Sequence, residues 1–301
     1  MEQSTTPDAI QELSWRDFLG LCKPKIVVMI VFTAIVGMFL STPGMIPLDA
    51  FIFGSIGIGL AAASAAAINH IVDEKIDSIM MRTSKRPLPD GKLSTRAAII
   101  FAACLCLVSM LVLGLLVNVL TAVLTLISLV GYGFIYSMYL KRATPLNIVI
   151  GGASGAAPPV LGWSAISGTL DANSLLLFLI IFAWTPPHFW ALAICRRNEY
   201  AKANIPMLPV THGVEFTRLH ILLYTMVLFV ITLLPYIILM SGPTYLFGAV
   251  VLGGWFLYYA IKMQKDHSDQ LAMKTFSFSI VYLLAIFAFL LVDHYIPVML
   301  G

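Results

Sequence analysis

Charged residues are scarce in this sequence of 301 residues. They make up 11% of it, and apolar residues make up 59%. Soluble domains carry roughly 25% charged and about 45–50% apolar residues. A soluble protein of this size needs a more polar exterior than this composition can supply. The scarcity of charge therefore excludes a soluble globular protein and indicates an integral membrane protein.

Two further classes are excluded by what is missing. The four cysteines form no Cys-x-x-Cys pair, so the sequence predicts neither a disulfide framework nor a zinc site. The net charge is only +3, and the basic residues lie in short loops. Because a nucleic-acid-binding protein needs a broad basic patch, we expect no nucleic acid partner.

The apolar residues are grouped into nine runs, each long enough to cross about 30 Å of hydrocarbon as a helix. The runs cover residues 26–45, 50–72, 97–117, 119–140, 146–165, 173–195, 219–240, 244–263 and 275–297. We therefore expect an all-α integral membrane protein with nine transmembrane helices, and read residues 26–301 as one domain behind a cytoplasmic segment 1–25.

The positive charges are distributed on one side of this nine-span arrangement. All 18 Lys and Arg residues fall before span one or in alternate loops, and the opposite loops hold only Asp49, Asp171 and Asp293. By the positive-inside rule, the N-terminus is cytoplasmic and the C-terminus lies outside. Residues 1–25 are too acidic for a transit peptide and lack the basic start of a signal peptide. We expect a multi-pass protein of the bacterial inner membrane.

The second run ends in three oxygen-bearing side chains that are spaced four residues apart. They are Asn69, Asp73 and Asp77, and on a helix this spacing places them along one stripe. Carboxylate and amide oxygens are ligands that Mg²⁺ prefers, usually together with substrate phosphates.

Cations follow directly after this stripe, at Arg82, Lys85 and Arg86. Arginine and lysine bind phosphate oxygens, so carboxylates followed by cations suit a metal–diphosphate complex better than a bare metal. The alternative is a solvated helix end in which Asp73 and Asp77 form local ion pairs. The Ala-rich approach at 61–67 favours a stripe that faces protein, where ionisable groups are functional by default.

These residues carry a family resemblance. Asn69-x-x-x-Asp73-x-x-x-Asp77 with the following Arg82-Thr83-x-x-Arg86-Pro87-Leu88 resembles the first aspartate-rich motif of the UbiA superfamily of intramembrane prenyltransferases. Further motifs resemble the branch that farnesylates protoheme IX: Lys23-Pro24-Lys25, Tyr136 with Leu140-Lys141-Arg142, Gly151-Gly152-x-x-Gly155-Ala156-x-Pro158-Pro159, Trp184-Thr185-Pro186-Pro187-His188-Phe189-Trp190 and Ile205-Pro206-Met207-Leu208-Pro209. They span residues 20 to 213.

The resemblance implies nine helices around a central cavity that opens to the cytoplasm, capped by the loops at about 77–96 and 199–217. It implies Mg²⁺ held by Asn69, Asp73, Asp77 and Glu199. Many members of the superfamily have a second motif with two aspartates four residues apart, and at that spacing this chain has Cys195 and Glu199. The implied substrates are farnesyl diphosphate and heme B, and the implied products are heme O and diphosphate. A homo-oligomer or a contact with heme A synthase is a further candidate partnership.

The remaining candidate residues have both a structural and a functional interpretation. Pro186-Pro187 is expected to kink or break its helix beside His188, which is either a catalytic residue in the cavity or a hydrogen-bonded packing residue. The resemblance places Tyr136 and Lys141 near the diphosphate. It also implies that Lys141 is a catalytic residue. Arg196 and Lys202 are either diphosphate ligands or charges that anchor the interface.

Two other functions stay open at this point. A related prenyltransferase that acts on an aromatic acid or quinone precursor would share the first motif. A membrane transporter would share the interrupted helices. Because every charged motif lies on one side, the residues themselves favour magnesium-assisted ionisation of an allylic diphosphate at the inner face.

Overall fold

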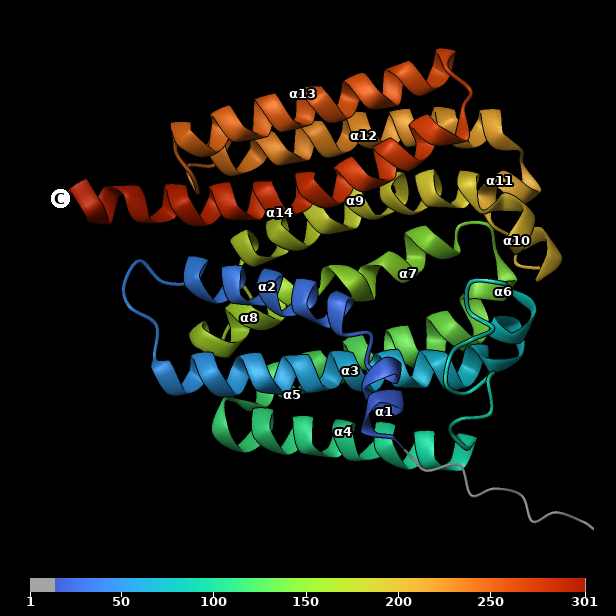
Figure 1. The fold of residues 1–301 in the computed structure, drawn as a ribbon. Coiled ribbons are helices and arrows are strands. Elements are labelled where there is room, and N and C mark those ends of the chain that lie inside the picture. Colours follow the sequence, from blue (N-terminus) through green and yellow to red (C-terminus); the bar gives the residue numbers. More distant parts are fainter. Residues whose placement is uncertain (1–13, 301) are drawn as a thin grey trace, which may run out of the picture.

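The computed structural model describes residues 14–300, so most of the segment 1–25 and Gly301 lie outside the described residues. The described part of the chain consists of helices and contains no β-strand. Figure 1 shows these helices side by side in one elongated bundle, with connections at its two ends. The predicted all-α class is confirmed.

Seven helical segments are long and apolar enough to cross a membrane. They are α3 (Leu48–Ile79), α4 (Thr95–Leu116), the continuous segment of α5 (Val119–Val130), η1 (Gly131–Leu140) and α6 (Lys141–Ala143), α9 (Ala172–Cys195), α12 (Val214–Ile237), α13 (Pro243–Lys265) and α14 (Asp269–Leu300). Large apolar side chains such as Leu115 and Phe247 are exposed on the outside of the bundle, as expected for a protein surrounded by lipid.

An eighth span is formed when α1 (Trp15–Leu21) and α2 (Pro24–Leu40) are taken together, although they are bent by 53°. The bend falls at Lys23, whose backbone is left-handed with φ of 50°. Pro24 is the first residue of α2, where its missing N–H costs nothing. In place of the predicted first span at 26–45, the structure has the shorter helix α2, which is preceded by the separate short helix α1.

The predicted fifth span at 146–165 is divided in the structure into α7 (Asn147–Ala156) and α8 (Pro158–Ser167). Each has ten residues, which is too short to cross a bilayer alone. Pro158 begins the second helix because it has no backbone N–H to continue the first. α8 packs on α2 at very short range: a Cβ on Gly162 would lie 1.8 Å from the carbonyl oxygen of Ala34.

The split between the predicted third and fourth spans is confirmed at Asn118. Its Oδ1 accepts a hydrogen bond from Thr121 N at 2.8 Å and so caps α5. Pro186 and Pro187 were expected to kink or break their helix, and the break is not found, since α9 runs through both. α9 is the most buried long span, and its packing on α7, α12 and α14 holds the helix together.

The connections that carry positive charge gather at one end of the bundle. Figure 1 shows α6, α10 (Arg197–Lys202), α11 (Leu208–Thr211) and the segment between α3 and α4 at this end, while the C-terminal end of α14 lies at the other. Asp293 lies within α14, inside the predicted ninth run at 275–297, and is buried. Its carboxylate accepts hydrogen bonds from the backbone N–H groups of Gly242 and Tyr245, and so caps α13.

Candidate active site

Three oxygen-bearing side chains of α3 lie together at the charged end of the bundle. α3 continues to Ile79, beyond the predicted limit at residue 72, so Asn69, Asp73 and Asp77 all project from one helix. Their exposed fractions are 5%, 2% and 4%. The Ala-rich stretch before them packs against α4, and the stripe itself faces η1, where Ser137 contacts Asn69. The stripe is therefore buried within the protein.

Each of these three side chains is bound by a cation from a different segment. The distances are 2.5 Å between Lys23 Nζ and Asn69 Oδ1, 2.6 Å between Lys141 Nζ and Asp73 Oδ2, and 2.5 Å between Arg86 Nη1 and Asp77 Oδ2. Asn69 Nδ2 also donates to Asp73 Oδ2 at 3.0 Å. A buried charge is costly unless it is paired, so these contacts explain how the acids are accommodated.

Lys23 is the site residue that sequence reasoning missed. It was counted only as a topology charge and as part of a motif. The bend between α1 and α2 turns its ammonium group inward onto Asn69, which lies 46 positions further along the chain. The available signal was the Lys-Pro pair at the start of an apolar run, since Pro24 fixes where α2 begins and leaves Lys23 at the junction.

A π-helix supplies the next wall of the site. η1 is a ten-residue π-helix, a rare structure that is often found at functional sites. Its Ser137 Oγ accepts from Asn69 Nδ2 at 3.0 Å. Tyr136 stacks on Tyr132 with a centroid distance of 5.5 Å. Lys141 follows directly at its end, so one irregular helix supplies both the hydroxyl and the ammonium group that contact α3.

Tyr136 also depends on a glycine of α7. A Cβ built on Gly151 would lie 2.1 Å from Cδ2 of the Tyr136 ring, so only glycine lets the ring lie here. The Gly-Gly motif at 151–152 therefore has a packing explanation at Gly151.

The second acidic segment lies where α9 ends. Arg196 caps α9, and its Nη1 is 2.6 Å from Glu199 Oε1 in α10. The side chain of Lys202 is exposed. Glu199 was expected to bind the metal ion, and Arg196 and Lys202 to bind diphosphate or to anchor the interface; the structure pairs Arg196 with Glu199.

Residues at the ends of α3 and α9 belong to one hydrophobic cluster. Ile76 and Met80 of α3 share this cluster with Ile194 of α9 and with Ala203 and Ile205 of the following segment. One buried apolar cluster therefore links the segments that carry Asp77 and Glu199.

Tyr200 lies among the charges of both segments. Burial raises the pKa of its phenol above the ordinary value. The charged groups that also act on it are Arg82, Glu199, Arg196 and Asp73.

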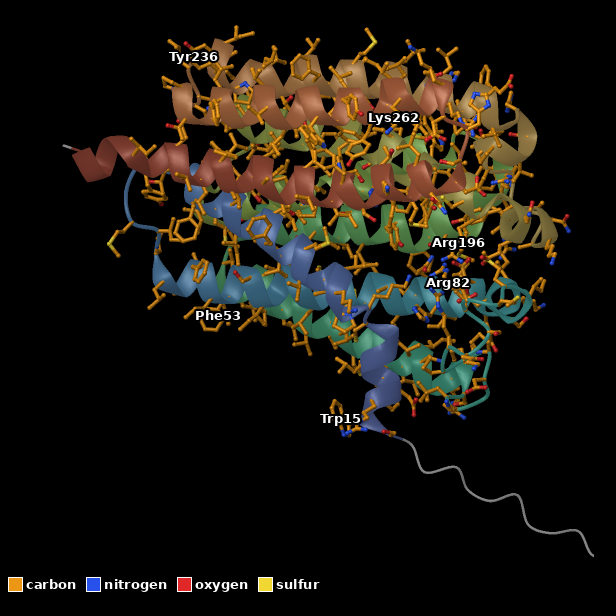
Figure 2. The ribbon with its side chains drawn as sticks, turned by 45° about the horizontal axis from the view of Figure 1, so that its top comes forward. Trp15, Phe53, Arg82, Arg196, Tyr236 and Lys262 are labelled. Carbon is orange, nitrogen blue, oxygen red and sulfur yellow. The ribbon has the colours of Figure 1, made fainter. Side chains whose placement is uncertain are left out.

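Arg82 and Lys85 are exposed, and Figure 2 shows Arg82 and Arg196 at the same end of the bundle. Both acidic segments and the basic loop after α3 thus meet in one region.

His188 has its own surroundings. Its Nδ1 lies 2.7 Å from Ser279 Oγ of α14. The ring is stacked between Trp184 and Phe276, at centroid distances of 4.1 Å and 4.6 Å. These contacts are those of a hydrogen-bonded side chain packed between α9 and α14, and they involve no acidic residue.

The donor atoms of the site fit a hard cation completed by substrate oxygens. Asp73 Oδ1 and Glu199 Oε2 are buried and have no hydrogen-bond partner. Within residues 14–300, no three acidic, histidine or cysteine side chains lie close enough to hold a metal ion together. Mg²⁺ commonly uses one or two carboxylates and takes its other ligands from water and phosphate, so this sparse set of oxygens suits it.

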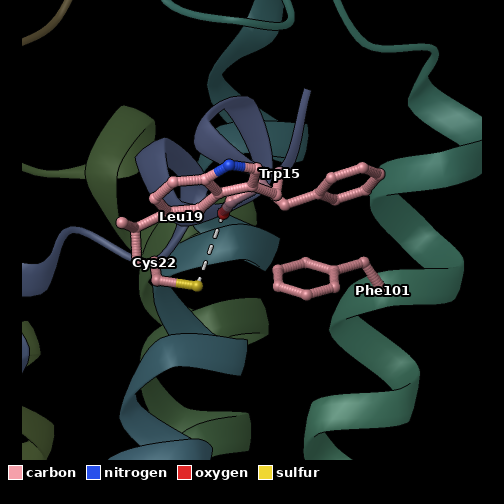
Figure 3. Close-up of a pocket in the computed structure, with 5 residues that line it drawn as sticks. Trp15, Leu19, Cys22 and Phe101 are labelled. Carbon is pink, nitrogen blue, oxygen red and sulfur yellow. Dashed lines mark hydrogen bonds between the residues drawn. The ribbon is translucent and has the colours of Figure 1, made fainter. Parts of the chain in front are cut away.

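Two apolar grooves lie away from these residues. One, on α13, is lined by Val251, Gly254, Trp255 and Tyr258. The other, of about 420 Å³, lies between α1 and α4 and is lined by Trp15, Phe18, Leu19, Cys22 and Phe101. Figure 3 shows the rings of this second groove and the hydrogen bond from Cys22 Sγ to the Phe18 carbonyl. Their lining is apolar, and neither groove includes a residue of the charged cluster.

The sequence matches known proteins along nearly its whole length. The model of the UbiA prenyltransferase family matches residues 30–291. The protoheme IX farnesyltransferase of Nitrosococcus oceani is 62% identical over 284 residues, which are 94% of this chain and 95% of that protein. The protoheme IX farnesyltransferase 1 of Pseudomonas aeruginosa is 56% identical, with 99% of each chain covered.

Solved structures share the fold at low sequence identity. A digeranylgeranylglyceryl phosphate synthase structure has a TM-score of 0.78 at 20% identity, covering 93% of this chain and 98% of its own. A UbiA homologue from Archaeoglobus fulgidus, bound to DMAPP and Mg²⁺, has a TM-score of 0.64 at 17% identity, covering 91% and 99%. At these identities, the comparison shows that the fold is shared and nothing further.

Proposed function

This chain belongs to the UbiA prenyltransferase family, and we propose from that premise that it transfers the farnesyl group of farnesyl diphosphate to a vinyl group of heme B. Water is added in the same reaction, so that the products are heme O and diphosphate. Relatives that are 53–62% identical over nearly their full length, all named protoheme IX farnesyltransferase, support this choice of acceptor.

We infer nine membrane crossings, with the divided α7–α8 pair as the fifth and α1 at the cytoplasmic boundary. The placement of the Lys and Arg residues in alternate loops supports this arrangement and a cytoplasmic N-terminus. The bacterial inner membrane is the proposed location, with the site chamber open to the cytoplasm beneath the loops 77–96 and 199–217. A homo-oligomer or a contact with heme A synthase belongs to the same proposal.

We assign Asn69, Asp73, Asp77 and Glu199 as the residues that hold Mg²⁺. The unpartnered, buried oxygens of Asp73 and Glu199 support this assignment. Bound there, Mg²⁺ would supply positive charge that neutralises the diphosphate leaving group.

We propose that the cations of the site bind the diphosphate. Lys141 and Arg86 already lie at the carboxylates, so their remaining N–H groups can reach phosphate oxygens bound beside Asp73 and Asp77. Lys23 joins them as a third partly buried cation. Further diphosphate contacts are assigned to exposed or partly exposed side chains: Arg82, Lys85, Arg196, Lys202 and Tyr136.

In the reaction, the bond between C1 of the farnesyl group and the diphosphate oxygen breaks, and its electron pair stays with the oxygen. The cations stabilise that charge, and the apolar walls keep bulk water from the allylic cation. A vinyl carbon of heme B attacks this cation, and the resulting carbocation takes up water with loss of a proton. His188, held by Ser279, is assigned to the acceptor side of the chamber.

The observation that carries this proposal is the burial of Asp73 and Asp77 beside three cations drawn from three segments. Purified protein in lipid nanodiscs should convert farnesyl diphosphate and heme B to heme O and diphosphate, and EDTA should stop this until Mg²⁺ is restored. Product from 4-hydroxybenzoate alone would identify the quinone-precursor alternative. A protein that releases no diphosphate with either acceptor would support the transporter alternative.

A further inference from the structure

His70 is a buried residue of α3 that has no role in the site described above. Its side chain is 3% exposed, and both ring nitrogens, Nδ1 and Nε2, are buried without a hydrogen-bond partner. A buried polar group that lacks a partner is rare and costs stability. Two such atoms on one ring therefore indicate a group that a ligand completes.

The position of His70 on α3 aligns it with the carboxylates. A residue turns a helix by about 100°, so Asp77, seven positions later, lies within about 20° of the direction of His70. Asp73, three positions later, lies about 60° away on the same side and about 4.5 Å along the axis. His70 thus extends the carboxylate face by one turn toward the middle of the bilayer.

The charges that act on the His70 ring are those of Lys23 and Arg86, which are both cations. Such surroundings favour an anionic ligand over a metal ion. A metal-binding histidine also usually has its second ring nitrogen held by a hydrogen bond, and neither nitrogen of His70 is held.

We propose that His70 is a further substrate-binding residue, whose ring N–H donates a hydrogen bond to the oxygen that joins the diphosphate to C1 of the farnesyl group. This inference rests on the proposed function. Because His70 lies about one turn deeper than Asp73 and about two turns deeper than Asp77, it meets the end of the diphosphate from which the isoprenoid extends. As the C1–O bond breaks and the electron pair remains on that oxygen, the hydrogen bond strengthens, and no proton is transferred.

The test compares two ligands, in the presence of Mg²⁺, that differ at this oxygen. Inorganic diphosphate presents the charged oxygen, and farnesyl thiolodiphosphate replaces it by sulfur, a poor acceptor. His70→Leu should weaken the binding of inorganic diphosphate by about tenfold and that of the thio analogue by about twofold or less, measured by calorimetry. It should also lower kcat with heme B by about 100-fold. His70→Gln and His70→Asn, which keep an N–H donor, should recover part of both losses.

Ser64→Ala supplies the matched control, because Ser64 is a buried polar residue of the same helix that only bonds to the Ala102 carbonyl. It should leave both affinities unchanged. The inference is overturned if His70→Leu binds inorganic diphosphate as the unchanged protein does, or weakens both ligands equally. It is also overturned if the variant alters the heme B absorption spectrum with diphosphate affinity intact. Failure of the unchanged protein to bind Mg²⁺ with diphosphate would instead refute the proposed function.

Discussion

The ammonium group of Lys141 lies 2.6 Å from one carboxylate oxygen of Asp73, while the other oxygen of Asp73 is buried without a partner. One half of this carboxylate is therefore neutralised by the protein, and the other half is available to a ligand. The pair joins α3 to the end of the π-helix across 68 positions of sequence.

Asp73→Asn should lower heme O formation by at least roughly 100-fold, because the amide cannot supply the anionic oxygen that a metal ion requires. The variant should still accumulate in the membrane, since Asn can accept from Lys141. Activity of purified protein and its level in membranes measure the two effects. Heme O synthesis at the rate of the unchanged protein would contradict the assignment of Asp73 to the metal.

Gly151→Ala should raise KM for farnesyl diphosphate, because the added methyl group would overlap the Tyr136 ring and displace it from the site. We expect a change of about tenfold, the size of one lost hydrogen bond to a charged group. Gly254→Ala is the control, since a Cβ at that helical glycine meets open space. If both variants gave the same KM, Tyr136 would not be a diphosphate residue.

Gly162→Ala should destabilise the bundle, because its Cβ would meet the backbone of Ala34 and force α2 and α8 apart. Overpacking of this kind costs about 1–3 kcal/mol, and backbone cannot move aside as a side chain can. A fall in Tm in detergent, with less protein in the membrane, is the expected result. An unchanged Tm would mean that α8 can shift without loss of packing.

Asp293→Asn should reduce stability and leave kcat unchanged. The two carboxylate oxygens accept from two backbone N–H groups at the start of α13, at the end of the bundle opposite the charged cluster. Asn can keep only one of these acceptors, and a buried donor left without a partner costs about 1–3 kcal/mol. Tm and kcat are measured on the same preparation. A large loss of kcat in the intact protein would show that this far end takes part in the reaction.

Neutral substitution of Lys262, Lys265 or Lys274 should keep activity within about twofold, since exposed charges of this kind contribute little to stability. Lys262 is exposed on α13, where its Nζ lies 5.9 Å from the centroid of the Tyr258 ring. Initial rates of Lys262→Gln, Lys265→Gln and Lys274→Gln provide the measurement. A loss comparable to that of Asp73→Asn would point to a site role for the α13–α14 connection.

Composition and apolar length were sufficient to predict the membrane class and the approximate place of the helices. They were sufficient because the membrane class and the helix positions follow from the composition and length of continuous segments, which do not depend on how the chain folds. The stripe of Asn69, Asp73 and Asp77 was predictable for the same reason, since spacing by four residues is a property of one helix.

What the sequence could not supply was contact between distant segments and local departures from regular helix. The inward turn of Lys23 depends on a 53° bend, and the partner of each acid depends on which loop folds over it. The π-helical stretch Gly131–Leu140 has no composition that separates it from an α-helix. That α9 continues through Pro186 and Pro187 could not be predicted, because the packing that supports it comes from other helices.

The internal pairing of the buried acids has a consequence for how the protein is made. Since Asp73 and Asp77 already have ammonium and guanidinium partners, their charge does not require magnesium before it can be enclosed. Insertion into the bilayer can therefore precede loading of the proposed Mg²⁺, and on that proposal a cell short of this ion would accumulate intact but inactive protein.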